Sequence, residues 1–241
     1  MSKKLKEKLP SLTIAIPAYN EDQNLEWVIK NTLQVAPNYL SDFEVLIVDD
    51  GSTDLTGKIA DEFTLANKKV RVVHQRNKGY GEAMLKGIKE AKKEYVAYMP
   101  ADGQFLVEDM KYCLPLMKDA DLILGTRGSR ADYSVYRLII SYTYLIVLRI
   151  LFGISFQDVN WLNIWNTKKV KSLKIDSRGV FLLGEIVIRF QKKGYKILEG
   201  SSYYRTRMGG RPKNSKLSIA LRTLYDACKL WFKLKFQNFH A

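Results

Sequence analysis

The fold class of this chain is indicated by one stretch, Phe43-Glu44-Val45-Leu46-Ile47-Val48-Asp49-Asp50-Gly51-Ser52-Thr53-Asp54. Its first half is a short continuous apolar run, which is typical of a strand buried on both faces of a parallel sheet. Two carboxylates and a glycine follow at the carboxyl end, where open α/β sheets bind ligands. An ordinary strand-to-helix turn, with Ser52 or Asp54 capping the next helix, would also explain these residues.

Strands and helices alternate on both sides of this stretch. This order predicts right-handed βαβ units and an α/β fold, with a mostly parallel sheet flanked by helices. The predicted strands cover residues 12–16 (ended by Pro17), 43–48, 70–74, 95–99 and 121–125, and the predicted helices 22–35, 54–66, 79–91 and the region around 107–118.

Composition points to a globular protein with an uneven charge. Of 241 residues, 46% are hydrophobic, which is enough to bury a sizeable core. The whole chain has a net charge of +14, and all of the excess positive charge lies in residues 121–241, which hold 22 lysines and arginines against 7 aspartates and glutamates. We therefore expect the second half to meet an anionic partner, such as a diphosphate, a lipid phosphate, a membrane surface or nucleic acid.

The two cysteines and the first ten residues bear on localisation. Cys113 and Cys228 lie far apart, without metal-ligand spacing, and favour a reducing compartment. Residues 1–10 carry four lysines and no apolar core of a leader sequence, so we expect no signal peptide.

Two apolar, cationic stretches characterise the second half. Residues 133–154 are rich in Leu, Ile, Val and Tyr, but only 11 residues separate Arg137 from Arg149. This is too short and too cationic to span a bilayer, which needs roughly 20 residues. The stretch predicts an amphipathic helix or helix pair in the membrane interface, or else a buried core helix. Residues 217–236 show the same mixture and predict a second surface-lying helix, or a helix packed on the sheet.

Four polar clusters follow the predicted strands. Because the carboxyl ends of parallel strands share one edge, we expect these clusters to meet there. They are residues 17–21 (Pro-Ala-Tyr-Asn-Glu), Asp49-Asp50, residues 78–81 (Lys-Gly-Tyr-Gly) and residues 101–104 (Ala-Asp-Gly-Gln).

Three of these motifs resemble those of family 2 glycosyltransferases of the GT-A fold. They are Ile16-Pro17-Ala18-Tyr19-Asn20-Glu21, Val48-Asp49-Asp50-Gly51-Ser52-Thr53-Asp54 and Asn77-Lys78-Gly79-Tyr80-Gly81. The second half narrows the resemblance to the dolichol-phosphate mannosyltransferase and polyprenyl-phosphate glycosyltransferase branch, through Gly125-Thr126-Arg127, Asp158 and residues 207–213. The resemblance implies one domain over residues 1–241. Residues 10–130 would bind the nucleotide sugar, and residues 131–241 the acceptor and the membrane surface.

The resemblance also implies roles for individual residues. Asp50 would read the base or ribose, and Gly79 would let the ligand approach closely because it has no side chain. The residues expected to bind the nucleotide sugar are Pro17, Ala18, Tyr19, Glu21, Asp49, Asp50, Lys78, Gly79, Ala101, Asp102, Gln104, Glu185, Arg207 and Lys213. Those expected to take part in catalysis are Asp102, Asp158, Arg127 and Arg207.

The implied metal site departs from the family pattern. The family carries Asp-x-Asp or Asp-x-Asp-x-Gln, whereas Pro100 occupies the first position here and leaves Asp102 and Gln104. These two oxygen ligands could hold Mg²⁺ or Mn²⁺ together with the donor diphosphate and water. One fewer carboxylate should weaken the affinity for the free ion.

Basic residues are the expected phosphate ligands. Arg207 and Lys213 match the family loop Arg-x-x-Gly-x-Ser-Lys, with Pro212 in place of the serine, and would fold over the donor diphosphate. Arg127, Arg137 and Arg149 are expected to bind the phosphate of a lipid acceptor.

Asp158 begins Asp158-Val159-Asn160-Trp161-Leu162, which lacks the glycine–phenylalanine pair of the family motif. It would orient the acceptor phosphate or the donor sugar, and Glu185 is a second candidate to contact the sugar. A lipid phosphate is already ionised at neutral pH and needs little general-base help, whereas a sugar hydroxyl acceptor would need a carboxylate base.

The function predicted is a metal-dependent, inverting transfer of a hexose from GDP-mannose, UDP-glucose or UDP-N-acetylglucosamine to a polyprenyl phosphate. We expect a peripheral enzyme on the cytoplasmic face of the membrane. The sequence leaves open whether it forms homo-oligomers. The alternatives are a transferase acting on a soluble glycan or glycolipid headgroup, and a nucleotide-sugar-binding protein without turnover. Nucleic acid is not the expected partner, because no recognition motif accompanies the basic residues.

Overall fold

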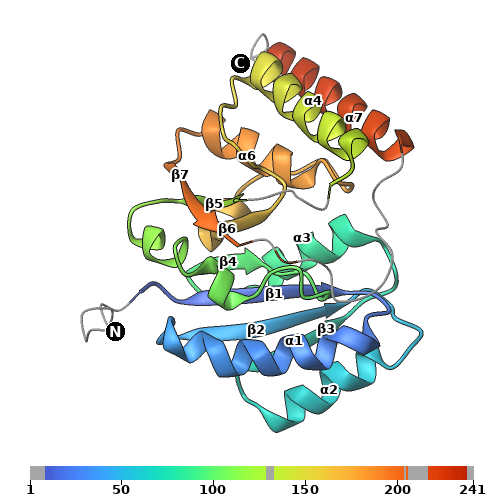
Figure 1. Cartoon of the computed structure of the whole chain (residues 1–241), viewed down its shortest axis with the longest axis vertical. Helices are drawn as coiled ribbons and strands as arrows, with labels where there is room; N and C mark the ends of the chain where they lie inside the picture. The colour runs from blue at the N-terminus through green and yellow to red at the C-terminus, as the bar shows by residue number, and fades with distance from the viewer. Residues whose placement is uncertain (1–8, 129–132, 204, 206–216, 238–241) are drawn as a thin grey trace.

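The computed structural model describes residues 9–128, 133–203, 205 and 217–237, whose strands form one seven-stranded sheet in the order β3-β2-β1-β4-β6-β5-β7 (Figure 1). Strand β6 is antiparallel to β4 and β5, and every other pair is parallel. The predicted mostly parallel α/β sheet is thereby confirmed. The strands are β1 (Leu12–Ala18), β2 (Phe43–Asp49), β3 (Val70–His74), β4 (Tyr95–Tyr98), β5 (Leu122–Arg127), β6 (Leu162–Asn166) and β7 (Ile197–Ser202).

Helices cover both faces of the sheet. One core includes residues of α1, α2, η3 and η4, and a second core includes residues of α3, α4, α5, α6 and α7. The α-helices are α1 (Asp22–Val35), α2 (Thr56–Ala66), α3 (Tyr80–Glu90), α4 (Val135–Phe152), α5 (Thr167–Lys171), α6 (Leu182–Lys192) and α7 (Leu217–Gln237). The short 3₁₀ helices are η2 (Ala36–Asn38), η3 (Val107–Met110) and η4 (Leu114–Lys118).

The central strands are apolar throughout because both of their faces are buried. In β1, Ile14 and Ile16 belong to the core under α1, whereas Ala15 belongs to the core under α3. Every residue of β2 is buried. This is the physical reason for the continuous apolar run that identified the strand.

Strand β1 continues through Pro17, which was expected to end it. Along the strand, alternate residues bond to opposite neighbours: the Ala18 carbonyl accepts from Asp50 of the β2 side, and the Ala15 carbonyl accepts from Met99 of the β4 side. Pro17 therefore faces β4, whose pairing with β1 ends at Tyr98. The missing N–H of proline breaks no ladder bond there.

The predicted helix around 107–118 is replaced by two short 3₁₀ helices, η3 and η4. Pro115 lies in the first turn of η4. It has no N–H to donate to a preceding turn, and it disfavours the α conformation of the residue before it. A continuous α-helix therefore cannot cross this position.

The second half adds strands that the apolar pattern did not predict. Strand β6 enters between β4 and β5 and is buried over its first four residues, one of which is the polar Asn163. Its sequence therefore shows no continuous apolar run. Strand β7 lies at the edge of the sheet beside β5, and its sequence Ile-Leu-Glu-Gly-Ser-Ser is half polar.

Helices α4 and α7 pack against each other at the end of the molecule farthest from α2 (Figure 1). Only 17% of the α4 segment is buried, which rules out the buried core helix weighed as an alternative. By length and composition α4 could cross a membrane, although the sequence predicted a stretch too short to do so. Its 18 residues make a helix about 27 Å long, close to the ~30 Å thickness of a hydrocarbon core.

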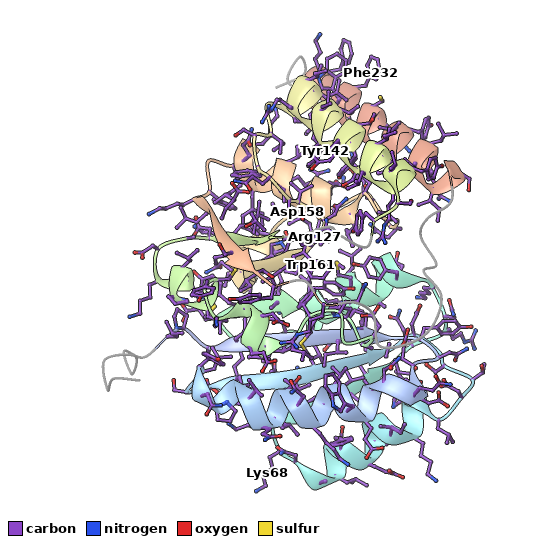
Figure 2. The ribbon with its side chains drawn as sticks, in the orientation of Figure 1. Lys68, Arg127, Tyr142, Asp158, Trp161 and Phe232 are labelled. Carbon is purple, nitrogen blue, oxygen red and sulfur yellow. The ribbon has the colours of Figure 1, made fainter. Side chains whose placement is uncertain are left out.

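Both helices expose apolar residues at helical spacing. We call these residues the outer stripes, and Tyr142 and Phe232 mark them in Figure 2. The outer stripes are Val135, Ile139, Tyr142, Ile146 and Ile150 on α4, and Leu221, Tyr225, Phe232 and Phe236 on α7.

Candidate active site

A cavity of about 910 Å³ opens at the carboxyl edge of the sheet. The ends of β1, β2, β4 and β5 contribute to it, together with the start of α3, as the shared edge of parallel strands predicts. We call it the transfer cavity. The predicted site residues that line it are Pro17, Ala18, Tyr19, Glu21, Asp50, Gly79, Ala101, Asp102, Gln104, Arg127 and Arg137.

The remaining predicted residues have other positions. Asp49, Lys78 and Glu185 do not line the transfer cavity, and Asp158 and Arg149 line a second cavity beside it. Arg207 and Lys213 lie outside the described residues.

Asp50 shapes the cavity by holding the loop that follows β3. The residue is 2% exposed, and its carboxylate accepts hydrogen bonds from the backbone N–H of Lys78 (2.9 Å) and of Gly79 (2.8 Å), and from the Gln75 side chain (2.7 Å). Gly79 has a φ of 88°, in the region that favours glycine. Asp50 therefore holds the backbone of Lys78 and Gly79 at the edge of the cavity.

Asp49, the last residue of β2, does not line the cavity but holds the turn that follows the strand. Its carboxylate accepts from the Ser52 N–H at 3.0 Å and contacts His74 Nδ1 at 2.9 Å. Burial alone would raise the pKa of Asp49, but the hydrogen bonds from Ser52 and His74 outweigh it and lower that pKa. Asp49 is thus a buried anchor for the turn after β2.

The loops after β1 and β2 are joined by Asn20, which the sequence analysis did not single out. Asn20 has a φ of 52°, and its side-chain oxygen accepts from the Thr53 N–H at 2.9 Å. In return, its backbone N–H donates to Ser52 Oγ at 3.1 Å. Asparagine tolerates this left-handed conformation better than most residues, which explains its place in the motif.

The turn expected to hold metal lies in the transfer cavity. Gly103 has a φ of 72°, and the Gln104 N–H donates to the Asp102 carboxylate at 3.1 Å. The described residues contain no group of three or more His, Cys, Asp or Glu placed to hold a metal ion. The turn therefore fits a divalent ion only if a bound ligand supplies further oxygen atoms.

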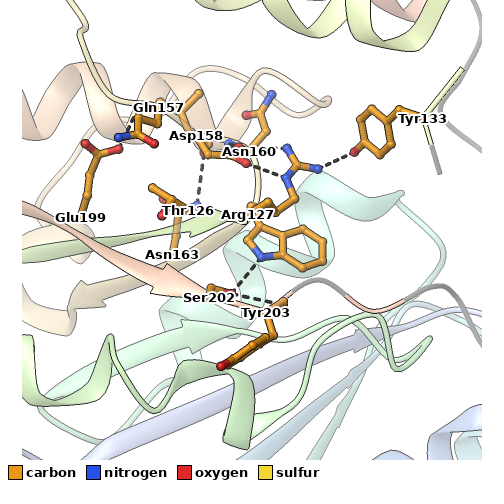
Figure 3. Close-up of polar contacts among 12 residues, drawn as sticks. Thr126, Arg127, Tyr133, Gln157, Asp158, Asn160, Asn163, Glu199, Ser202 and Tyr203 are labelled. Carbon is orange, nitrogen blue, oxygen red and sulfur yellow. Dashed lines mark hydrogen bonds and ion pairs between the residues drawn. The ribbon is translucent and has the colours of Figure 1, made fainter. Parts of the chain in front are cut away.

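Arg127 is held by Asp158 in a bidentate ion pair, drawn in Figure 3. Nε lies 2.6 Å from Oδ2 and Nη2 lies 3.0 Å from Oδ1. The side chains are only 7% and 4% exposed. Asp158 was expected to touch the acceptor phosphate or the donor sugar, but its carboxylate is committed to Arg127 and lies outside the transfer cavity.

Aromatic rings surround this guanidinium and line the cavity wall. The Cζ atom of Arg127 lies 5.1 Å from the centroid of the Trp161 ring, and the Arg127 guanidinium also donates a hydrogen bond to the Tyr133 hydroxyl. Arg137 lies 3.7 Å from the other aromatic neighbour, the Tyr133 ring. Burial lowers the pKa of Arg127, but the Asp158 carboxylate outweighs it, so the pKa is raised and the group stays charged.

A second group of aromatic rings lines the transfer cavity and was not predicted from the sequence. Tyr80 packs edge-on against Tyr98 at 5.7 Å, Tyr98 against Phe105 at 6.2 Å, and Phe105 against Trp161 at 4.9 Å. These aromatics come from four separate segments, so no local sequence pattern joins them. They give the transfer cavity an apolar side built of rings packed edge to face.

Glu185, on α6, is fully buried away from this cavity. Its carboxylate accepts from the backbone N–H of Asp176 (3.0 Å) and of Ser177 (2.7 Å), and Arg189 Nε lies 2.6 Å from it. Three donors satisfy the group inside the protein. Its position is that of a support for the 176–177 segment.

Comparison with known proteins agrees with this geometry. The model of the family described as "Glycosyl transferase family 2" matches residues 13–171 of this chain. Polyprenol monophosphomannose synthase of Mycolicibacterium smegmatis is 29% identical over 220 residues, which cover 86% of this chain and 82% of that protein. Undecaprenyl-phosphate mannosyltransferase of Micrococcus luteus is 28% identical over 200 residues, which cover 78% and 80%. A Streptococcus pneumoniae glycosyltransferase is 37% identical over 123 residues, but this chain covers only 38% of it.

Among solved structures, glucosyl-3-phosphoglycerate synthase from Mycobacterium tuberculosis, in complex with Mn²⁺, UDP-glucose and phosphoglyceric acid, superposes with a TM-score of 0.71. The two chains are 18% identical over 91% of this chain and 80% of that one, which shows a shared fold. The sheet order, the flanking helices and the cavity at the carboxyl edge are those of the GT-A fold. The chain belongs to glycosyl transferase family 2.

Proposed function

We propose that this protein transfers a hexose from a nucleotide sugar to a polyprenyl phosphate at a membrane surface. The extent of the transfer cavity carries the proposal. At one end the cavity is lined by Pro17 and Asp50 of the nucleotide motifs, and at the other by Arg137 on α4 and Leu224 on α7. A sugar donor and an acceptor with an apolar tail could therefore meet in one continuous space. The names of the M. smegmatis and M. luteus relatives support this choice of acceptor.

The donor end fits a nucleotide diphosphate. The Asp50 loop provides hydrogen-bonding groups for the base and ribose, and the aromatic side provides apolar ring surface. Asp102 and Gln104 would hold Mg²⁺ or Mn²⁺ on the diphosphate, and the ion would neutralise the charge of the leaving nucleoside diphosphate.

The acceptor end fits a phosphate. Arg127 and Arg137 both line the cavity, and Tyr133 lies between them and contacts each. Two guanidinium groups could orient a phosphate oxygen toward the anomeric carbon. That oxygen would form the new bond as the bond to the diphosphate breaks, with inversion at the carbon. The phosphate is already ionised, so the step needs no general base, which agrees with the commitment of Asp158 to Arg127.

Membrane association is proposed from the outer stripes of α4 and α7. Apolar side chains exposed along two packed helices are typical of interfacial helices. We place the protein on the cytoplasmic face, as expected from the sequence. The two described cysteines are unpaired, which supports a reducing compartment.

A transfer assay tests this proposal. Purified protein, Mn²⁺ or Mg²⁺ and a short polyprenyl phosphate are incubated in parallel with labelled UDP-glucose, UDP-N-acetylglucosamine and GDP-mannose. We expect label to enter the organic phase with one donor, and this transfer to stop with a chelator or with unphosphorylated polyprenol. Arg137→Gln should lower transfer by about 10- to 100-fold, because it removes charge-assisted bonds to the phosphate. Arg222→Gln, an exposed arginine outside both cavities, is the matched control.

Other outcomes would redirect the proposal. Label that stays in the aqueous phase while nucleoside diphosphate is released would move the acceptor to a soluble glycan, and label on a glycolipid would move it to that headgroup. Tight nucleotide binding without any release of diphosphate, across donors and acceptors, would indicate a binding protein without turnover.

A further inference from the structure

A second cavity, of about 440 Å³, lies against the Arg127–Asp158 pair. Its walls are the end of β5, one side of α4 and residues 154–158. Arg149 and Gln157 provide polar groups, and Tyr142, Ile146 and Phe156 provide an apolar side. The cavity is therefore amphipathic, and two of its apolar residues, Tyr142 and Ile146, belong to the outer stripe of α4.

Arg149 is the uncompensated charge of this cavity. Its guanidinium forms no hydrogen bond or ion pair with any part of the chain that the structure describes. The carboxylate in the wall, Asp158, is neutralised by Arg127. The nearby Glu199 accepts from the Gln157 N–H at 2.7 Å and is not among the lining residues. Among the lining residues that the structure describes, the charges therefore sum to a net positive value next to apolar side chains.

The second cavity is separate from the transfer cavity. Arg127 borders both, but Arg149 lines only the second and Arg137 only the first. Twelve positions on one helix separate Arg137 from Arg149, or about 18 Å along the axis. The two side chains thus line different cavities, although both had been expected to bind the acceptor phosphate.

We propose that the second cavity binds the phosphate of an anionic phospholipid in the bilayer, and not the acceptor that receives the sugar. The positive charge of Arg149 complements the headgroup, and the adjoining outer stripe of α4 would accompany the acyl chains into the membrane. A phosphate held there is kept from the donor sugar by the buried Arg127–Asp158 pair. The inference rests on the membrane association proposed above, but not on the identity of the acceptor.

Vesicle flotation with two arginine variants tests the site. Full-length protein is mixed with phosphatidylcholine vesicles that do or do not contain phosphatidylglycerol, and the bound fraction is measured. A basic residue near an anionic surface contributes on the order of a fivefold gain in partitioning, so Arg222→Gln, on the neighbouring helix α7, should lose about that much or less. Arg149→Gln should lose at least about tenfold, because a cavity adds hydrogen bonds to the charge. Lys68→Gln, at the opposite end of the molecule (Figure 2), should change nothing.

Transfer to a short polyprenyl phosphate in detergent gives the second readout. Arg149→Gln should keep this activity within about twofold, whereas Arg137→Gln should lose it and still bind phosphatidylglycerol vesicles. The proposal is overturned if Arg149→Gln weakens vesicle binding no more than Arg222→Gln, or if it abolishes transfer in detergent while vesicle binding is unchanged. Failure of the wild-type protein to transfer sugar, with the vesicle difference intact, would reject the proposed acceptor and retain the lipid site.

Discussion

The pair between Arg127 and Asp158 makes Asp158→Asn the most informative single substitution. Asparagine keeps the shape of the side chain but removes its charge, and it leaves the Arg127 guanidinium 7% exposed without a counter-ion. Removing one partner of a buried ion pair costs about 3–5 kcal/mol. The amide oxygen can still accept one hydrogen bond, and Trp161 and Tyr133 remain as neighbours. We therefore expect a loss of about 3 kcal/mol in the free energy of unfolding.

A double-mutant cycle separates the pair from its surroundings. Urea unfolding is measured for Asp158→Asn, Arg127→Gln and the double variant. Each single variant buries an unpaired partner, whereas the double variant does not, so its loss should be smaller than the sum of the two. If each single variant lost less than about 1 kcal/mol and the losses were additive, the pair would contribute nothing and the reasoning would be refuted.

The same variant distinguishes positioning from proton transfer. If Asp158 only positions Arg127, Asp158→Asn should lower kcat/KM for the acceptor and leave the shape of the pH–rate profile unchanged. If Asp158 were a general base, the acidic limb of that profile would disappear in the variant. Disappearance of the limb would contradict the assignment of Asp158 as a positioning residue.

Three further predictions concern packing, pH and metal. Gly81→Ala should lose about 1–3 kcal/mol of stability in urea, because a Cβ there overlaps a backbone carbonyl, whereas the matched Gly179→Ala meets nothing within 4 Å and should be neutral. The hydrogen bond with Asp49 raises the pKa of His74 above 6.5 despite burial. The stability that protonated His74 contributes is therefore fully present below pH 6.5 and is lost as the pH rises through the raised pKa of His74. Melting temperatures measured across this pH range should decline in the wild type but not in His74→Gln. Pro100→Asp should restore a metal carboxylate and lower the Mn²⁺ concentration for half-maximal transfer on the order of tenfold, and an unchanged requirement would remove position 100 from the metal site.

The first half of the fold was predictable because its signals are local. A strand buried on both faces must be apolar at every position, so β1 and β2 could be identified from their own residues. The errors have local causes too: Pro17 was tolerated because β4 ends beside it, and Pro115 divided a predicted helix. Strand β6 was missed because its position between β4 and β5 depends on long-range pairing, which no local pattern records.

The site was predictable as a set of loops, but not residue by residue. Motifs that follow parallel strands share an edge by topology, so Pro17, Asp50 and Asp102 were expected together and are found together. Which acidic group is free for a ligand depends on its partners. Asp158 and Glu185 were plausible ligands from their position in the chain, and both turn out to be satisfied by protein donors.

The class of fold, the family and the edge of the sheet where the donor motifs gather could all be inferred from local sequence, because alternation of elements and short motifs are properties of neighbouring residues. The pairing of the charges, and the cavity that each arginine lines, depend instead on the packing of segments that are distant in the chain. Arg137 and Arg149 are both cationic residues in one apolar helix, and the sequence could not distinguish them. Their separation follows from the pitch of α4 and from the buried pair that divides the space beside it, and both depend on how distant segments pack.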